Sequence, residues 1–85
     1  MRPFQLLISL EVVKTIENLK RSTRLAIRDK IREIGRDPMG CSDANEFDAK
    51  GRIIEITIVD EYALSYWVDS ADQQIKILDI SLADG

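Results

Sequence analysis

Five arginines follow one another through the first half of the chain at intervals of three or four residues: Arg21, Arg24, Arg28, Arg32 and Arg36. In a helix, this spacing places them along one side. A row of guanidinium groups can bind the carboxylates of a protein or the phosphates of a nucleic acid through paired hydrogen bonds. The other interpretation is a solvated helix face on which Glu17, Asp29 and Glu33 pair with the arginines. We take Arg21, Arg24, Arg28 and Arg32 as candidate contacts for a partner.

Lys50 and Arg52 flank a glycine just before a run of apolar residues, and a single tryptophan, Trp67, lies farther along the chain. Two cations at a strand entrance can stabilise the negative charge that develops when a phosphodiester is attacked, although such a pair is more often a plain charged turn. An outward-facing tryptophan suits a protein partner or a stacked base, unless it packs against Phe47. Lys50 and Arg52 are the candidate catalytic residues, and Trp67 joins the candidate partner contacts.

Several kinds of chemistry are excluded by residues that the chain lacks. It contains no histidine and one cysteine, Cys41, so disulfide scaffolds, Cys/His zinc sites and imidazole catalysis are excluded, and we expect neither a metal site nor a cofactor. Cys41 has no cationic neighbour in sequence to lower its pKa, so a reactive role is not expected. The longest apolar stretch, residues 6–8, is far shorter than the ~20 residues of a membrane span, and Glu11 and Lys14 soon interrupt it. We expect a cytoplasmic protein with no membrane contact.

The net charge of −3 conceals two halves of opposite sign. Residues 1–36 carry +5 and residues 37–85 carry −8. The basic half suits phosphate or an acidic partner, whereas the acidic half repels nucleic acid unless it faces away. The molecule should therefore be bipolar.

Hydrophobic periodicity divides the 85 residues into the elements of one domain, 1–85. We expect a strand over 4–10, a helix from 11 to about 19, a second helix from about 23 to 35, a loop over 37–51, and strands over 54–58, 62–68 and 75–82. Phe47 is expected to anchor the long loop to the core. The order βααβββ predicts an α+β fold in which a two-helix hairpin covers one face of a four-stranded, mainly antiparallel sheet.

Alternation within the strands also predicts which side chains meet the helices. Tyr62, Leu64 and Tyr66 should face them, which leaves Trp67 on the open face of the sheet with Ala63 and Ser65.

This order of elements, with several spaced residues, resembles the RelE/ParE superfamily of toxins. The matching segments are the opening strand from Phe4 to Ile8, a helix containing residues 12–19, a second helix that closes with Ile31-Arg32-Glu33-Ile34-Gly35-Arg36-Asp37-Pro38, the hairpin from Arg52 to Asp69, and the last strand from Ile75 to Ile80. The resemblance implies a toxin that is encoded beside an antitoxin in a prokaryotic type II module. RelE-like members cleave mRNA on the ribosome without a metal, using Lys and Arg on the open sheet face and a tyrosine near the C-terminus, and ParE-like members inhibit gyrase.

The chain departs from that pattern at the positions that carry the chemistry. Glu55 and Thr57 are expected on the open face where ribonuclease members have cations, and Ala63 follows Tyr62 where an arginine is common. The sequence ends about where the remaining family Arg and Tyr would begin. Our leading hypothesis is therefore an attenuated toxin-like component, translation-inhibiting if active and bound by an acidic or amphipathic antitoxin segment. The alternatives are a catalytically inactive RelE-fold adaptor, or a ribosome- and mRNA-directed ribonuclease with displaced catalytic residues.

Overall fold

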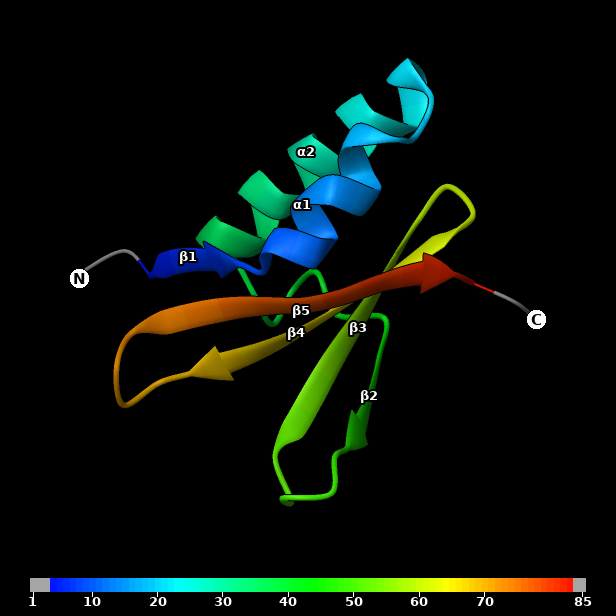
Figure 1. The fold of residues 1–85 in the computed structure, drawn as a ribbon. Coiled ribbons are helices and arrows are strands. Elements are labelled where there is room, and N and C mark those ends of the chain that lie inside the picture. Colours follow the sequence, from blue (N-terminus) through cyan, green and yellow to red (C-terminus); the bar gives the residue numbers. More distant parts are fainter. Residues whose placement is uncertain (1–3, 84–85) are drawn as a thin grey trace.

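Two helices and five strands form in residues 4–83, the part of the chain that the computed structural model describes (Figure 1). The elements are β1 Gln5–Ile8, α1 Leu10–Glu17, α2 Arg21–Arg36, β2 Ala44–Phe47, β3 Ile53–Val59, β4 Tyr62–Asp69 and β5 Gln74–Leu82. Neither helix is long and apolar enough to cross a bilayer.

Local signals fix where α1 begins and where α2 ends. The Ser9 hydroxyl accepts a hydrogen bond from the backbone N–H of Val12 at 3.2 Å, so Leu10 begins α1 instead of ending the first strand. The second helix ends where the N–H of Asp37 donates to the carbonyl of Glu33, one residue before Pro38, which cannot continue a helix. Because only residues 18–20 join the two helices, the helices lie side by side.

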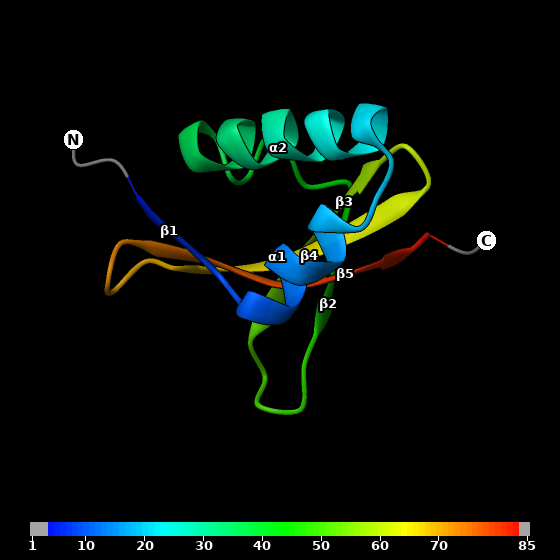
Figure 2. The same cartoon turned by 45° about the horizontal axis from the view of Figure 1, so that its top comes forward.

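The strands form one sheet in the order β1-β5-β4-β3-β2, in which β1 runs parallel to β5 and the other neighbours are antiparallel. Both helices lie on the same side of this sheet (Figure 2). The predicted α+β fold with a helical hairpin on a mainly antiparallel sheet is confirmed, with one difference. The segment predicted as a loop over 37–51 contains a fifth strand, β2, which pairs with β3 at the sheet edge.

The core lies between the helices and the three central strands. Ile27 and Ile34 from α2 are fully buried there, together with Leu64 and Tyr66 from β4. The prediction that Leu64 and Tyr66 face the helices is confirmed. Because neighbouring side chains on a strand point to opposite faces, Trp67 lies on the open face, as expected.

The face assignment of the polar residues on β3 was wrong. Glu55 and Thr57 stand opposite Tyr66 and Leu64 in the β3–β4 ladder, so they share the helix-covered face, and both are buried. Ile54, Ile56 and Ile58, which alternate with these polar residues, occupy the open face instead. Glu55 therefore does not place a negative charge on the open sheet.

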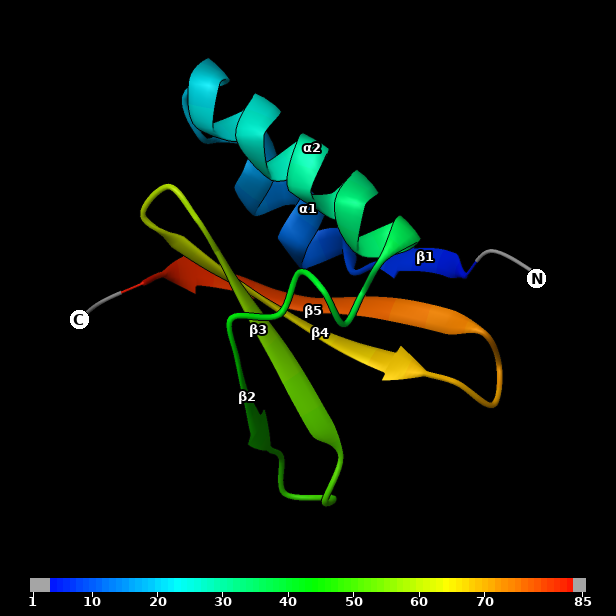
Figure 3. The same cartoon turned by 180° about the vertical axis from the view of Figure 1, so that it is seen from behind.

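The expected role of Phe47 was also wrong, because its side chain is 73% exposed on the edge strand β2. Polar contacts hold the preceding loop in its place. The Ser42 hydroxyl donates to Glu55 at 2.7 Å, Asp43 accepts from the N–H of Ile58 at 2.8 Å, and the Tyr66 hydroxyl donates to the carbonyl of Pro38. Viewed from behind, this segment connects α2 to β2, and the β2–β3 hairpin extends away from the helices (Figure 3).

Candidate functional site: an arginine-rimmed groove and a clamped tryptophan

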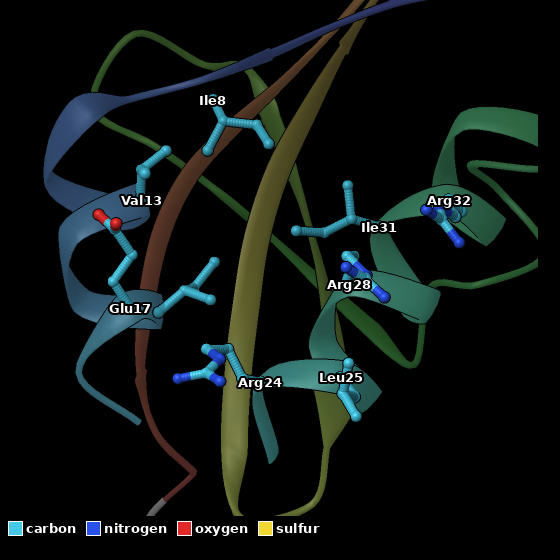
Figure 4. Close-up of a pocket in the computed structure, with 9 residues that line it drawn as sticks. Ile8, Val13, Glu17, Arg24, Leu25, Arg28, Ile31 and Arg32 are labelled. Carbon is cyan, nitrogen blue, oxygen red and sulfur yellow. The ribbon is translucent and has the colours of Figure 1, made fainter. Parts of the chain in front are cut away.

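An open groove of about 340 Å³ runs between α1 and α2 (Figure 4). Its floor is apolar, and its rim is charged, with one acid from α1 and three arginines from α2. The apolar lining residues are Ile8, Val13, Ile16, Leu25 and Ile31, and the charged ones are Glu17, Arg24, Arg28 and Arg32.

The groove exists because each helix has apolar residues on two sides. The helix α1 buries Val12 in the core but leaves Val13 36% exposed. The helix α2 likewise buries Ile27 and leaves Leu25 37% exposed. If the sheet covered all the apolar side chains of both helices, charged residues would be expected at these positions. The outer apolar side chains therefore form a surface that the rest of the domain does not cover.

The arginines of the groove have no acidic partner within residues 4–83. The ion pairs in that range join Lys30 to Glu33, Arg52 to Asp48 and Lys76 to Asp69. Glu33, one of the acids expected to neutralise the arginine stripe, is thus 3.3 Å from Lys30 instead. The structure therefore does not support the interpretation in which the arginines of this helix face form ion pairs with neighbouring acids. Three exposed guanidinium groups stand along one wall with their hydrogen-bonding capacity directed to solvent.

A second cluster lies on the open face of the sheet, around Trp67. The guanidinium carbon of Arg52 is 4.7 Å from the centroid of the indole ring, and Nζ of Lys76 is 4.9 Å from it. Both distances are those of cation–π contacts. Lys76 reaches the ring because it is the cross-strand partner of Trp67 in the β4–β5 ladder. Trp67 is thus held between two cations from neighbouring strands.

The Asp48 carboxylate also binds one of these cations, Arg52. Oδ2 of Asp48 accepts from Nε of Arg52 at 2.7 Å, and Oδ1 of Asp48 accepts from the backbone N–H groups of Lys50 and Arg52 at 2.9 Å. Burial opposes the ionisation of Asp48, but these hydrogen bonds and the charge of Arg52 outweigh it and lower the pKa of the carboxyl. Gly51 completes the turn at a φ of +80°, which favours glycine. The turn therefore fixes Arg52 against Trp67, whereas Lys50 is exposed at its tip.

The predicted site residues divide between two surfaces. Arg24, Arg28 and Arg32 line the groove, and Arg52 and Trp67 contact each other on the opposite side of the sheet. Arg21 begins α2 and does not line the groove, and Lys50 takes part in none of the ion pairs found within residues 4–83. Their functional roles stay predictions.

Sequence reasoning missed two parts of this arrangement. Lys76 was not selected, because its contact with Trp67 depends on the register of β4 against β5. The apolar floor was missed because Val13 and Leu25 were assigned to helices without a surplus apolar side. The hint was present in the sequence, since Val12-Val13 and Leu25-Ala26-Ile27 spread apolar residues around more of each helix than one core-facing stripe requires.

Metal and thiol chemistry find no geometric support in the part of the chain described. The His, Cys, Asp and Glu side chains of residues 4–83 do not gather into a group of three that could hold a metal ion. Burial raises the pKa of the Cys41 thiol, and the nearby Lys30 opposes that rise only partly. The thiol is therefore mainly protonated at neutral pH, in line with the expectation that it is not a nucleophile.

Solved structures of RelE proteins share this fold. A chain of the RelE–RelB complex from Pyrococcus horikoshii matches with a TM-score of 0.83 and 18% identity, over 96% of this chain and 97% of that chain. A chain of the toxin–antitoxin complex RelBE2 from Mycobacterium tuberculosis matches with a TM-score of 0.79 and 16% identity, over 99% and 97%. A mutant of the Escherichia coli RelE toxin in the free state matches with a TM-score of 0.73 and 16% identity, over 98% of this chain and 86% of that chain.

The sequence itself matches no protein-family model and no curated protein. The likeness at 16–18% identity establishes the fold, and the resemblance inferred from the residues is confirmed at that level.

Proposed function

We propose that this chain, which has the RelE fold, is the toxin-like component of a type II toxin–antitoxin module and that an antitoxin segment is its main partner. The observation that carries the proposal is the groove between α1 and α2, where Arg24, Arg28 and Arg32 stand over apolar side chains without an internal ion pair. Exposed cations over uncovered apolar surface suit an acidic, amphipathic segment that folds on binding. Arg21, at the start of the same helix, and Trp67 are the further candidate contacts.

The open sheet face bears on whether the component is active. Arg52 and Lys76 lie there, but Asp48 and Asp69 engage them, which reduces the positive charge offered to a phosphate. This observation favours the second candidate function, a catalytically inactive RelE-fold adaptor. The buried position of Glu55 works in the other direction, because it removes one acid that was expected to repel RNA from this face. Lys50 and Arg52 remain the proposed catalytic residues of an active, metal-independent mRNA ribonuclease.

The proposal predicts that tightly regulated expression of the chain in bacteria arrests growth and reduces amino-acid incorporation. A Lys50→Ala/Arg52→Ala variant should restore both if the chemistry lies at the β2–β3 turn. An Arg21→Ala/Arg36→Ala variant is the matched control, because it removes two exposed cations from outside the groove and the open face. Arrest by the control but not by the double turn variant supports an active ribonuclease at this position.

Two other outcomes separate the candidates. If both variants arrest growth, the toxin assignment stands, and the catalytic residues lie elsewhere than at Lys50 and Arg52. Unaffected growth, with the chain confirmed as soluble and folded by circular dichroism, contradicts the toxin assignment and supports the adaptor.

A further inference from the structure

We infer that a pocket on the helix side of the sheet, beyond the end of α2, binds a primary ammonium group on a short aliphatic stem, with the Glu55 carboxylate as its counter-ion. The pocket has a volume of about 250 Å³, and its lining residues differ from those of the groove between the helices. The inference does not depend on the proposed function. Three features lead to it: a buried acid without a cation, an opening that reaches this acid, and apolar side chains beside it.

Glu55 is a buried acid to which the described part of the chain supplies no cation. It is only 4% exposed, and none of the ion pairs within residues 4–83 includes it. Asp69, the other acid buried in this range, has Nζ of Lys76 at 3.6 Å. A buried carboxylate without a counter-charge is costly. A bound cation would therefore remove a cost that the fold itself leaves in place.

One oxygen of this carboxylate is available to a ligand. Oε1 of Glu55 accepts from the Ser42 hydroxyl at 2.7 Å, but that hydroxyl has a single proton and a second acceptor, the Ala44 carbonyl, at 2.9 Å. Oε2 has no donor within residues 4–83. Because every side-chain nitrogen and oxygen that is shut off from solvent in this range has a hydrogen-bond partner, Oε2 retains contact with solvent. Glu55 borders the pocket, which provides this contact.

The pocket lies at an end of the sheet that the helices leave uncovered. The β2–β3 hairpin extends away from the helices here (Figure 3), so the loop residue Met39 borders the pocket in place of a helix. Met39 is 61% exposed and Ile53 is 47% exposed. The lining residues are Met39, Ile53, Glu55, Trp67, Val68 and Ser70. Trp67 is among them, although its ring contacts Arg52 on the open face, because β4 forms one wall of the pocket.

The lining selects the size and the charge of the ligand. The volume of about 250 Å³ is below the roughly 300–1,000 Å³ of sites for drug-sized ligands, so it suits one short chain of atoms. Met39, Ile53 and Val68 offer apolar contact to a methylene stem, and Glu55 can pair with an ammonium group at its end. An anion is disfavoured, because Glu55 would repel it and the lining contains no Lys or Arg side chain to attract it.

n-Pentylamine is a suitable probe, because it joins an aliphatic stem to an amine that is protonated at neutral pH. Three control compounds separate these features: pentanol lacks the charge, pentanoate reverses it, and ammonium chloride lacks the stem. Binding to the intact chain is followed by backbone amide chemical shifts, which report both the affinity and the position of the ligand.

A fourth compound, Nα-acetyl-lysine amide, distinguishes two sources of the same chemical group. If its affinity is within about threefold of that of pentylamine, the natural ligand is a lysine side chain of a protein, and if its binding is weaker, the natural ligand is a free amine. Both results support the ammonium site.

We expect saturable shifts with pentylamine at Met39, Ile53 and Ser70, and binding of the three control compounds that is at least about tenfold weaker. Glu55→Gln keeps the side-chain volume and an acceptor for Ser42 but removes the charge, so it should weaken pentylamine binding at least about tenfold. Glu46→Gln is the matched control: it makes the same charge change at an exposed position of β2 outside the pocket, and should change the affinity less than about twofold.

Ser70→Lys tests the pocket without altering Glu55 or the core. Ser70 is an exposed lining residue, so the introduced ammonium group should compete with pentylamine for Glu55 and weaken its binding at least about threefold. Ser81→Lys adds the same charge at an exposed position of β5 outside the pocket, and should change the affinity less than about 1.5-fold. This pair of variants decides the question even if Glu55→Gln does not fold.

Several results would overturn the inference. Pentanol that binds as tightly as pentylamine would show that the charge of Glu55 does not contribute. Equal effects of the two glutamine variants, or of the two lysine variants, would reduce the binding to a general attraction between the acidic half of the chain and a cation. Shifts confined to the groove between α1 and α2, or shifts that do not saturate, would remove the ligand from this pocket.

Discussion

The Tyr66 hydroxyl forms a hydrogen bond that connects the loop after α2 to the core. It lies on β4, is fully buried, and donates to the carbonyl of Pro38 at 2.5 Å. Tyr66→Phe keeps the ring in the core and leaves the Pro38 carbonyl without this donor. We therefore expect the substitution to destabilise the fold through one hydrogen bond and not through a cavity.

The size of the effect follows from the burial of both groups. A buried acceptor that loses its partner costs about 1–3 kcal/mol, and the hydroxyl removed was itself buried, so we expect a loss of about 1.5 kcal/mol in the free energy of unfolding. In a domain of 60–100 residues, each kcal/mol shifts the melting temperature by about 4–8 °C. The expected decrease is therefore about 6–12 °C. Urea unfolding followed by circular dichroism measures the same free energy independently.

Tyr62→Phe is the matched control, because Tyr62 is only partly buried and its hydroxyl forms no hydrogen bond within residues 4–83. It should change the free energy of unfolding by less than about 0.5 kcal/mol. If both substitutions have the same effect, the bond from Tyr66 to Pro38 does not fix the loop, and the argument from burial is refuted.

Alkaline pH provides a second test of the same contact. Burial, and then nearby negative charge, raises the pKa of the Tyr66 hydroxyl above its usual value. The unfolded chain therefore releases this proton at lower pH than the folded chain does. Its contribution to stability is complete below a pH of about 10 and is lost as the pH rises further. The wild type should lose more stability than Tyr66→Phe between a pH of about 9 and 11, so the difference between them should narrow.

Two further predictions concern the turn that carries the candidate catalytic residues. The lowered pKa of Asp48 means that its contribution to stability is present above a pH of about 4 and is lost below it, so thermal melts should show a weaker decline on acidification for Asp48→Asn than for the wild type. Arg52→Ala removes the cation that lies 4.7 Å from the Trp67 ring, and should increase the quenching of tryptophan fluorescence by acrylamide, whereas Lys14→Ala, on α1, should leave it unchanged. Unaltered quenching in Arg52→Ala would contradict the stacked arrangement.

The order of elements was predictable because their periodicities are strong and local. Ile27, Ile31 and Ile34 recur with the period of a helix, and the strands after Gly51 alternate over seven to nine residues. The strand β2 could not be found in the same way. Its four residues, Ala-Asn-Glu-Phe, are all exposed and show no alternation, so only pairing with β3 defines it.

The face of each strand was less predictable than its existence. Alternation separates Glu55 and Thr57 from the isoleucines at 54, 56 and 58, but it does not say which set faces the helices. We expected Glu55 and Thr57 on the open face, which would have turned the isoleucines at 54, 56 and 58 toward the helices. The structure places Glu55 there because Ser42, from a loop 13 residues away, supplies a hydrogen bond that makes its burial tolerable. No local signal in the sequence reports such a partner.

Under the proposed function, the separation of the two surfaces determines how an antitoxin segment would act. The groove lies on the helix side of the sheet and Trp67 on the open side, so a segment that fills the groove leaves Arg52, Trp67 and Lys76 uncovered. Binding and neutralisation are then separable. A segment confined to the groove would anchor the partner without blocking the open face, and blocking would require the chain to continue around the β1 or β2 edge of the sheet. Variants of the groove should accordingly weaken the affinity for the proposed segment, whereas variants at Lys50 and Arg52 should alter the activity proposed for the free protein.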